Sequence, residues 1–102
     1  MPQHRLDEAA AQLRPMLDAE DATQGMHIQC RRGAIVLSRE SSAEPPEQPE
    51  LDPRFRLTPL GMDQFGLSLH RLDRWERLPF EGRLADLVEV MNTALAHWAV
   101  EF

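Results

Sequence analysis

The segment from Phe65 to Phe80 constrains the fold more than any other part of this 102-residue chain. Apolar and polar residues alternate along its first half, a short turn follows at Leu72–Asp73, and a second run begins at Trp75. A period of two residues is that of a half-buried β-strand, and a two-residue loop joins antiparallel strands into a hairpin. We therefore predict a β-hairpin. Its expected cross-strand pairs are His70–Trp75, Ser68–Arg77 and Leu67–Leu78.

An amphipathic helix is expected to follow the hairpin, from Gly82 to Phe102. Its apolar residues recur at spacings of three and four over nearly five turns, which is the pattern of a helix with one buried side. They are Leu84, Leu87, Val88, Met91, Ala94, Leu95, Trp98 and Phe102. This stripe predicts that the helix packs against one face of the sheet.

The first half of the chain predicts a second helix and further strands. Apolar spacing indicates a helix over residues 3–20, bent near Arg14 because Pro15 lacks an amide hydrogen and its ring crowds the preceding turn. Alternation or β-branched composition predicts strands at 26–31, 34–38 and 55–58, the last of them ended by Pro59.

This order of elements predicts one α+β domain over residues 1–102. We expect a two-layer sandwich with an N-terminal helix, four to five mostly antiparallel strands, and a C-terminal helix packed on one sheet face. The other sheet face should stay open. Residues 39–53 contain four prolines and five acidic residues, so we expect a mobile loop there.

The expected layout is similar to that of two groups of small proteins, type III secretion chaperones and frataxin-like iron-binding proteins. Both place terminal helices around an antiparallel sheet. The chain departs from each pattern, because the chaperone layout has a further helix where this chain has its proline-rich segment, and residues 26–32 lack the acidic residues of a frataxin ridge.

Composition limits the classes of partner and location. The net charge is −6, and only residues 53–83 carry more arginines (six) than acidic residues (four), which argues against general binding of nucleic acid. The chain has no lysine, so chemistry that needs a lysine amine is excluded. One cysteine, an N-terminal segment without an apolar core and apolar runs of only about four residues predict a cytoplasmic protein that does not enter a membrane.

Three groups of residues are candidates for a chemical site. His27 and Cys30 have the spacing of two metal ligands on a helix, but on a strand they point to opposite faces. Ser68 and His70 share a face, yet no strained turn presents the serine as a nucleophile. The acidic residues near the end of the first helix (Asp18, Glu20 and Asp21) are typical of a solvated helix end. We therefore predict no catalytic residues, no metal site and no cofactor.

The remaining candidate is the open face of the predicted sheet. The hairpin register and the neighbouring strand bring together Arg56, Ser68, His70, Trp75 and Arg77. A tryptophan flanked by arginines has the composition of a protein interface. The sequence therefore favours a non-enzymatic interaction module that binds a protein partner or a second copy of itself. The alternatives are a small-ligand or anion-binding protein that uses the same residues and, less favoured, a metal-handling protein or an enzyme.

Overall fold

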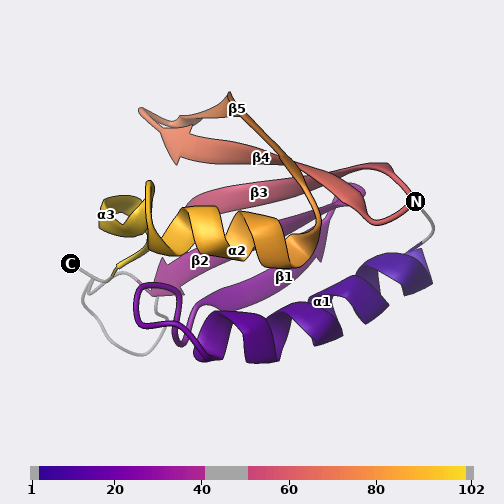
Figure 1. The fold of residues 1–102 in the computed structure, drawn as a ribbon. Coiled ribbons are helices and arrows are strands. Elements are labelled where there is room, and N and C mark those ends of the chain that lie inside the picture. The colour runs from indigo at the N-terminus through magenta and orange to yellow at the C-terminus, as the bar shows by residue number, and fades with distance from the viewer. Residues whose placement is uncertain (1–2, 41–50, 101–102) are drawn as a thin grey trace.

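The computed structural model describes residues 3–40 and 51–100 of the chain (Figure 1). Its elements in chain order are α1 (Gln3–Asp18), β1 (His27–Arg31), β2 (Ala34–Glu40), β3 (Leu51–Gly61), β4 (Gln64–Arg71), β5 (Arg74–Gly82), α2 (Leu84–Asn92) and α3 (Ala96–Ala99). The five strands form one antiparallel sheet in which the spatial order follows the chain, from β1 to β5.

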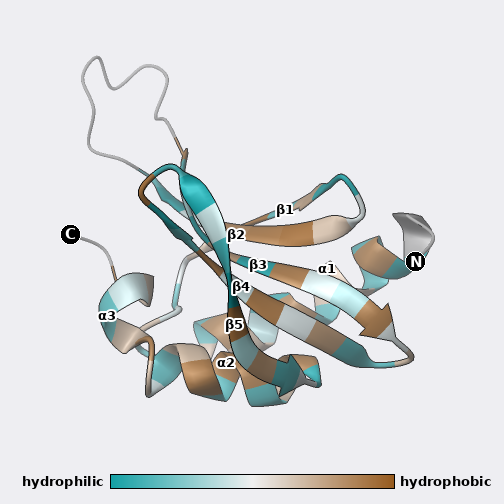
Figure 2. Ribbon diagram, turned by 90° about the horizontal axis from the view of Figure 1, so that it is seen from above, coloured by the Kyte–Doolittle hydropathy of each residue, from teal (hydrophilic) through white to brown (hydrophobic). Residues whose placement is uncertain are grey.

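Both long helices cover the same face of this sheet. The helix α1 packs against β1 and β2, while α2 packs against β4, β5 and α1. Figure 2 shows the two helices together on one side of the strands, with no helix drawn on the other side. The predicted α+β architecture is therefore confirmed, and no helix among the described residues covers the other face.

The core lies between the helices and the sheet. The apolar stripe of α1 supplies four buried side chains, and each of the central strands β2, β3 and β4 contributes the apolar members of its alternating pattern. The completely buried large side chains include Leu13, Leu37, Phe55, Leu67 and Met91. Burying one such side chain stabilises the fold by about 1.5–3 kcal/mol, so the alternation that defines each strand also holds the layers together.

Pro15 does not interrupt the first helix. Figure 1 shows α1 as one continuous helix, and it extends three residues beyond the proline to Asp18. Pro15 has no amide hydrogen to donate, but its carbonyl still accepts a hydrogen bond from the amide of Ala19 at 3.1 Å. Helical hydrogen bonding therefore continues after the proline. Leu13 and Leu17, on either side of the proline, are both completely buried, so the helix packs on the sheet before and after this position.

The segment predicted as a mobile loop, 39–53, begins and ends in strands. Arg39 and Glu40 complete β2 and pair with Asp52 and Leu51 of β3. The middle of the segment, 41–50, lies outside the described residues. The prediction of a short third strand was also wrong, because β3 continues through Pro59 to Gly61. The sheet accommodates the proline, which has no amide to donate, at a register shift between Pro59 and Gly61.

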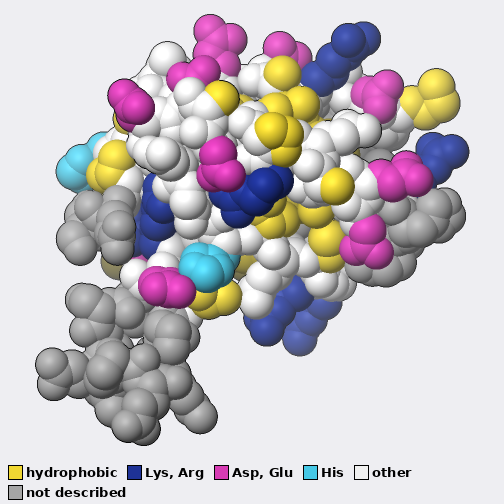
Figure 3. Space-filling view, turned by 90° about the horizontal axis from the view of Figure 1, so that it is seen from below, with side chains coloured by type: hydrophobic (Ala, Val, Ile, Leu, Met, Phe, Trp, Pro, Cys, Tyr) yellow, Lys and Arg dark blue, Asp and Glu magenta, His cyan; other side chains and the backbone are white. Residues whose placement is uncertain are grey.

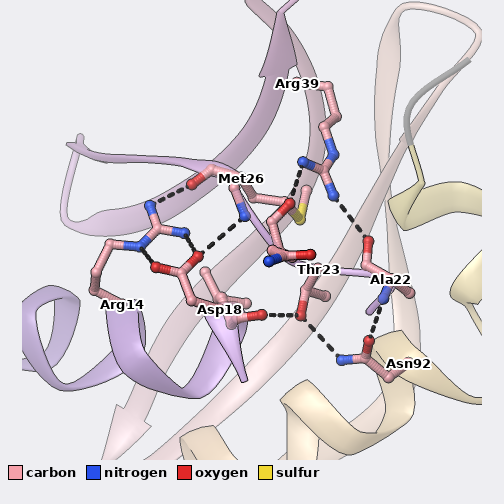
Figure 4. A network of polar contacts seen from close by, with 10 residues as sticks. Arg14, Asp18, Ala22, Thr23, Met26, Arg39 and Asn92 are labelled. Carbon is pink, nitrogen blue, oxygen red and sulfur yellow. Dashed lines mark hydrogen bonds and ion pairs between the residues drawn. The ribbon is translucent and has the colours of Figure 1, made fainter. Parts of the chain in front are cut away.

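The C-terminal helix is shorter than its apolar stripe predicts. It ends at Asn92, and a separate short helix, α3, begins at Ala96. The side chain of Asn92 accepts a hydrogen bond from the amide of Ala22 at 2.9 Å and donates one to the hydroxyl of Thr23 at 3.0 Å (Figure 4). These bonds attach the end of α2 to the connection between α1 and β1, and Thr93 then leaves helical geometry.

The hairpin of β4 and β5 has the predicted register near its turn. His70 lies opposite Trp75 and Ser68 lies opposite Arg77. Leu72 and Asp73 have φ angles of 53° and 62°, the combination that lets a two-residue turn follow the twist of its strands. The predicted pairing of Leu67 with Leu78 was wrong, since the register shifts between Gly66 and Ser68. The shift adds two residues to β5, an even number, so every side chain keeps its predicted face.

Candidate interaction face of the sheet

Strand pairing places the predicted site residues on the open face of the sheet. Arg56 is the register partner of Ser68, and Ser68 is in turn the partner of Arg77, so these three form one row across β3, β4 and β5. His70 and Trp75 form the next pair towards the hairpin turn. The five residues predicted from the sequence are therefore neighbours on one surface.

Trp75 lies at the centre of this group. The Cζ atom of Arg56 is 4.8 Å from the centroid of the indole ring, within the range of a cation–π interaction. The imidazole of His70 meets the same ring edge-on, with 4.9 Å between ring centroids. Trp75 is half-buried by these contacts, so part of the indole remains open to solvent.

The guanidinium of Arg56 has no acidic partner among the described residues. Its Nε atom is buried and has no hydrogen-bond acceptor within that part of the chain. An unpaired buried N–H group costs about 1–3 kcal/mol. The cation–π contact with Trp75 holds the guanidinium in place without satisfying its buried Nε–H group.

Arg77 covers the part of the face next to Arg56. A side-chain carbon on Gly66 would lie 2.6 Å from the Cζ atom of Arg77, so only glycine lets the guanidinium lie flat on β4. Arg77 also pairs with Glu81 at 2.9 Å. Both of these side chains are about half exposed, and an ion pair of this kind contributes at most about 1 kcal/mol.

The sequence predicted that Ser68 is exposed to solvent, but in the structure it is buried. It is only 1% exposed, because it lies in the row between the two arginine side chains. A hydroxyl covered in this way does not reach a substrate. We therefore assign Ser68 to the base of the face and not to its binding surface, and its proximity to His70 does not form a nucleophile–base pair at the surface.

The open face is more basic than acidic, although the chain is acidic as a whole. Its strand residues include three arginines, Arg31, Arg56 and Arg77, and two glutamates that already have partners. Glu81 pairs with Arg77, and Glu40 lies 3.1 Å from the Nε2 atom of His27. Arg56 and Arg77 come from the arginine-rich middle of the chain, whereas Arg31 comes from β1, so this face takes only part of its positive charge from that segment.

The other candidate residues, His27 and Cys30, occupy ordinary positions in the sheet. His27 pairs with Ser38 and Cys30 with Ile35, on opposite faces of β1, as expected for two strand residues three apart. Burial raises the pKa of the Cys30 thiol, and the negative charge of Asp7 raises it further, so this cysteine is not activated as a nucleophile. Within residues 3–40 and 51–100, no three His, Cys, Asp or Glu side chains gather as a metal site.

Asp18 has a structural role at the end of α1. Its carboxylate accepts a hydrogen bond from the amide of Gly25 at 3.0 Å and pairs with Arg14 at 2.7 Å (Figure 4). The Gly25 amide, followed by Arg14, lowers the pKa of this carboxyl group below its ordinary value. The acidic cluster predicted from the sequence therefore includes one residue that closes the connection between α1 and β1.

A groove that the sequence analysis did not identify lies on the other side of the molecule. It has a volume of about 950 Å³ and is bordered by α1, the turn between β3 and β4, and the start of α2. Its apolar lining includes Met16, Phe65 and Leu84, and Met62 at its edge is 85% exposed. The signal in the sequence was Met62, an apolar residue in the turn between β3 and β4, together with Leu60 near the end of β3.

Comparison of the chain with protein-family models, with curated proteins and with solved structures gives no match. No described helix has the length and apolar character needed to cross a lipid bilayer.

Proposed function

We propose that this protein is a small, non-enzymatic interaction module whose open sheet face binds an acidic segment of a protein partner. The observation that carries the proposal is the arrangement of Arg56 against Trp75. The indole offers a half-buried apolar surface, and the guanidinium beside it has no carboxylate of its own within the described residues. Tryptophan and arginine are the residue types that contribute most to protein interfaces.

The charge of the face supports an acidic occupant. Of its three arginines, only Arg77 has an ion-pair partner among the described residues, and that partner is half exposed and can exchange. An extended segment with carboxylates could pair with Arg56 and Arg77 while an apolar side chain covers Trp75. Arg56 would contribute most, because a guanidinium fixed by stacking loses less side-chain entropy on binding.

The proposal is tested with an extended peptide of alternating glutamate and leucine, and with its lysine counterpart as the control. Binding is followed by NMR through the two indole N–H signals, because Trp75 lies on the face while Trp98 lies in α3. We expect the acidic peptide to shift the Trp75 signal alone and Arg56→Gln to weaken binding about tenfold, which corresponds to about 1.4 kcal/mol. Arg5→Gln, the same charge change on α1, should leave the affinity unchanged.

Two results would overturn the proposal. One is equal binding of the acidic and the basic peptide, or an equal effect of the two arginine substitutions. The other is a shift of the Trp75 signal by inorganic phosphate together with no binding of the peptide, which would establish the face as a small-anion site.

A second candidate function, binding of a small apolar ligand, is supported by the groove between α1 and α2. Its volume of about 950 Å³ lies within the range of small-molecule sites, and its lining combines apolar side chains such as Met16 and Phe65 with charged ones such as Arg5. A hydrophobic fluorescent probe whose binding is blocked by Gln12→Trp, an exposed position in the lining of the groove, and is unaffected by Trp75→Ala, would support this function.

A further inference from the structure

The two outer strands of the sheet differ in how they are protected from pairing with another strand. On β5, Pro79 lacks an amide, a two-residue shift interrupts the register, and exposed charged residues follow the edge. Natural sheets use such features to prevent association through their edges. On β1, all five residues pair with β2 in an unbroken register, and the strand contains no proline and no acidic residue.

The outer strand β1 also leaves apolar surface uncovered. Ile28 and Cys30 point towards the helices and pack against the core, but both remain partly exposed at the edge. Figure 3, which views the molecule from the side of α1 and β1, shows hydrophobic side chains at the surface with charged groups around them. Within the described residues, β1 has a hydrogen-bonded neighbour on one side only, β2.

We propose that β1 pairs with β1 of a second copy of this chain, about a two-fold axis at Gln29. This inference does not depend on the proposed function of the open face. An antiparallel pairing centred on Gln29 includes all five residues of the strand and keeps the helices of both copies on the same side of a continuous sheet. A pairing displaced by one residue would place the helices of the two copies on opposite sides.

The side chains of β1 are complementary to themselves in this register. Gln29 meets Gln29 of the second copy, and each amide offers both a donor and an acceptor. Ile28 meets Cys30 of the second copy on the helix side, which places apolar residues opposite each other twice. On the open face, Arg31 meets His27 of the second copy.

Charge complementarity supports the second copy as the occupant of this edge. Arg31 is exposed and has no acidic partner among the described residues, while His27 lies 3.1 Å from the carboxylate of Glu40. The register therefore brings the guanidinium of Arg31 next to the His27–Glu40 pair of the second copy. The two-fold axis repeats this contact at both ends of the strand.

Oligomeric state gives the first test. Sedimentation velocity from micromolar to submillimolar concentration is expected to show reversible formation of a species with twice the 11.7 kDa mass of the chain. Arg31→Glu should weaken the association about tenfold, because it places like charges together at two contacts. Arg74→Glu, the same change on β5, should have no effect, and combining Arg31→Glu with Glu40→Arg should restore the dimer.

A cross-link tests the register itself. In a Cys30→Ala background, Gln29→Cys places two thiols directly opposite each other, where Cα atoms about 4.5–5.5 Å apart suit a disulfide. Arg31→Cys is the matched control, because residue 31 of each copy would lie about 13 Å from residue 31 of the other. We expect a disulfide-linked dimer from Gln29→Cys alone. A chain that stays monomeric, or equal cross-linking of both folded variants, would overturn the proposal.

Discussion

Asn92, the last residue of α2, donates a hydrogen bond from its side chain to the hydroxyl of Thr23 at 3.0 Å. The two residues are 69 positions apart in the chain, and Thr23 is completely buried. Thr23 donates in turn to the carbonyl of Leu17 at 2.8 Å, so the bond connects the ends of both long helices. This contact lies at the point where α2 ends.

Asn92→Ala is expected to destabilise the protein by about 1–3 kcal/mol, because the buried amide of Ala22 loses its acceptor and the hydroxyl of Thr23 loses one of its two hydrogen bonds. Chemical denaturation measures the change. Thr93→Ala is the matched control, since its hydroxyl donates only to the exposed carbonyl of Glu89, and its effect should stay within about 0.5 kcal/mol. Equal effects of the two substitutions would contradict the structural role of Asn92.

Arg39→Met is expected to destabilise the protein by about 3 kcal/mol or more. The buried guanidinium donates to three carbonyl oxygens, those of Ala22, Gln24 and Ala99, at 2.8, 2.6 and 2.8 Å. Each hydrogen bond to a charged group contributes about 1.5–3 kcal/mol. Arg39→Lys should recover less than half of the lost stability, because an ammonium group cannot reproduce the planar arrangement of N–H donors in a guanidinium. The exposed Arg71→Met is the control in the same thermal and chemical denaturation series.

Leu72→Asn is expected to stabilise the protein by about 0.5–1 kcal/mol. Leu72 is 82% exposed and has a φ angle of 53°, a conformation that asparagine adopts more readily than leucine. Leu72→Ala also removes the exposed apolar side chain, but it does not relieve the backbone strain at this φ angle. It should therefore not increase the stability. If the alanine variant is as stable as the asparagine variant, removal of the exposed side chain is the cause and backbone strain is not.

Asp18→Asn is expected to destabilise the protein at neutral pH but not in acid. The folded state lowers the pKa of Asp18 below its ordinary value of 3.8, so the stabilising contribution is fully present above that pH. It is lost as the pH falls through the lowered value, where the carboxyl group becomes protonated in the folded protein. Denaturation of wild type and Asp18→Asn across the acid range should therefore give converging stabilities. Asp21→Asn, which removes an exposed charge nearby, should show no convergence.

Much of the candidate interaction face could be predicted from the sequence, because it depends on local period. Alternation from Phe65 onward and a two-residue turn at Leu72–Asp73 determined which residues of β4 and β5 share a face. That pattern placed Trp75 beside His70 and correctly paired Ser68 with Arg77. The burial of Ser68 could not be predicted in the same way, because it depends on how two long arginine side chains lie over their neighbours.

The sequence by itself determined the α+β class, the helix-covered face and the sheet face that carries Trp75. These follow from apolar periods of two and 3.6 residues, which each segment carries independently of the rest. Only the tertiary structure decided that α2 ends at Asn92 and that Arg39, in a segment that reads as loop, is buried. Both depend on hydrogen bonds between groups that are distant in the chain and close in the fold. A local pattern of residues does not predict such long-range contacts.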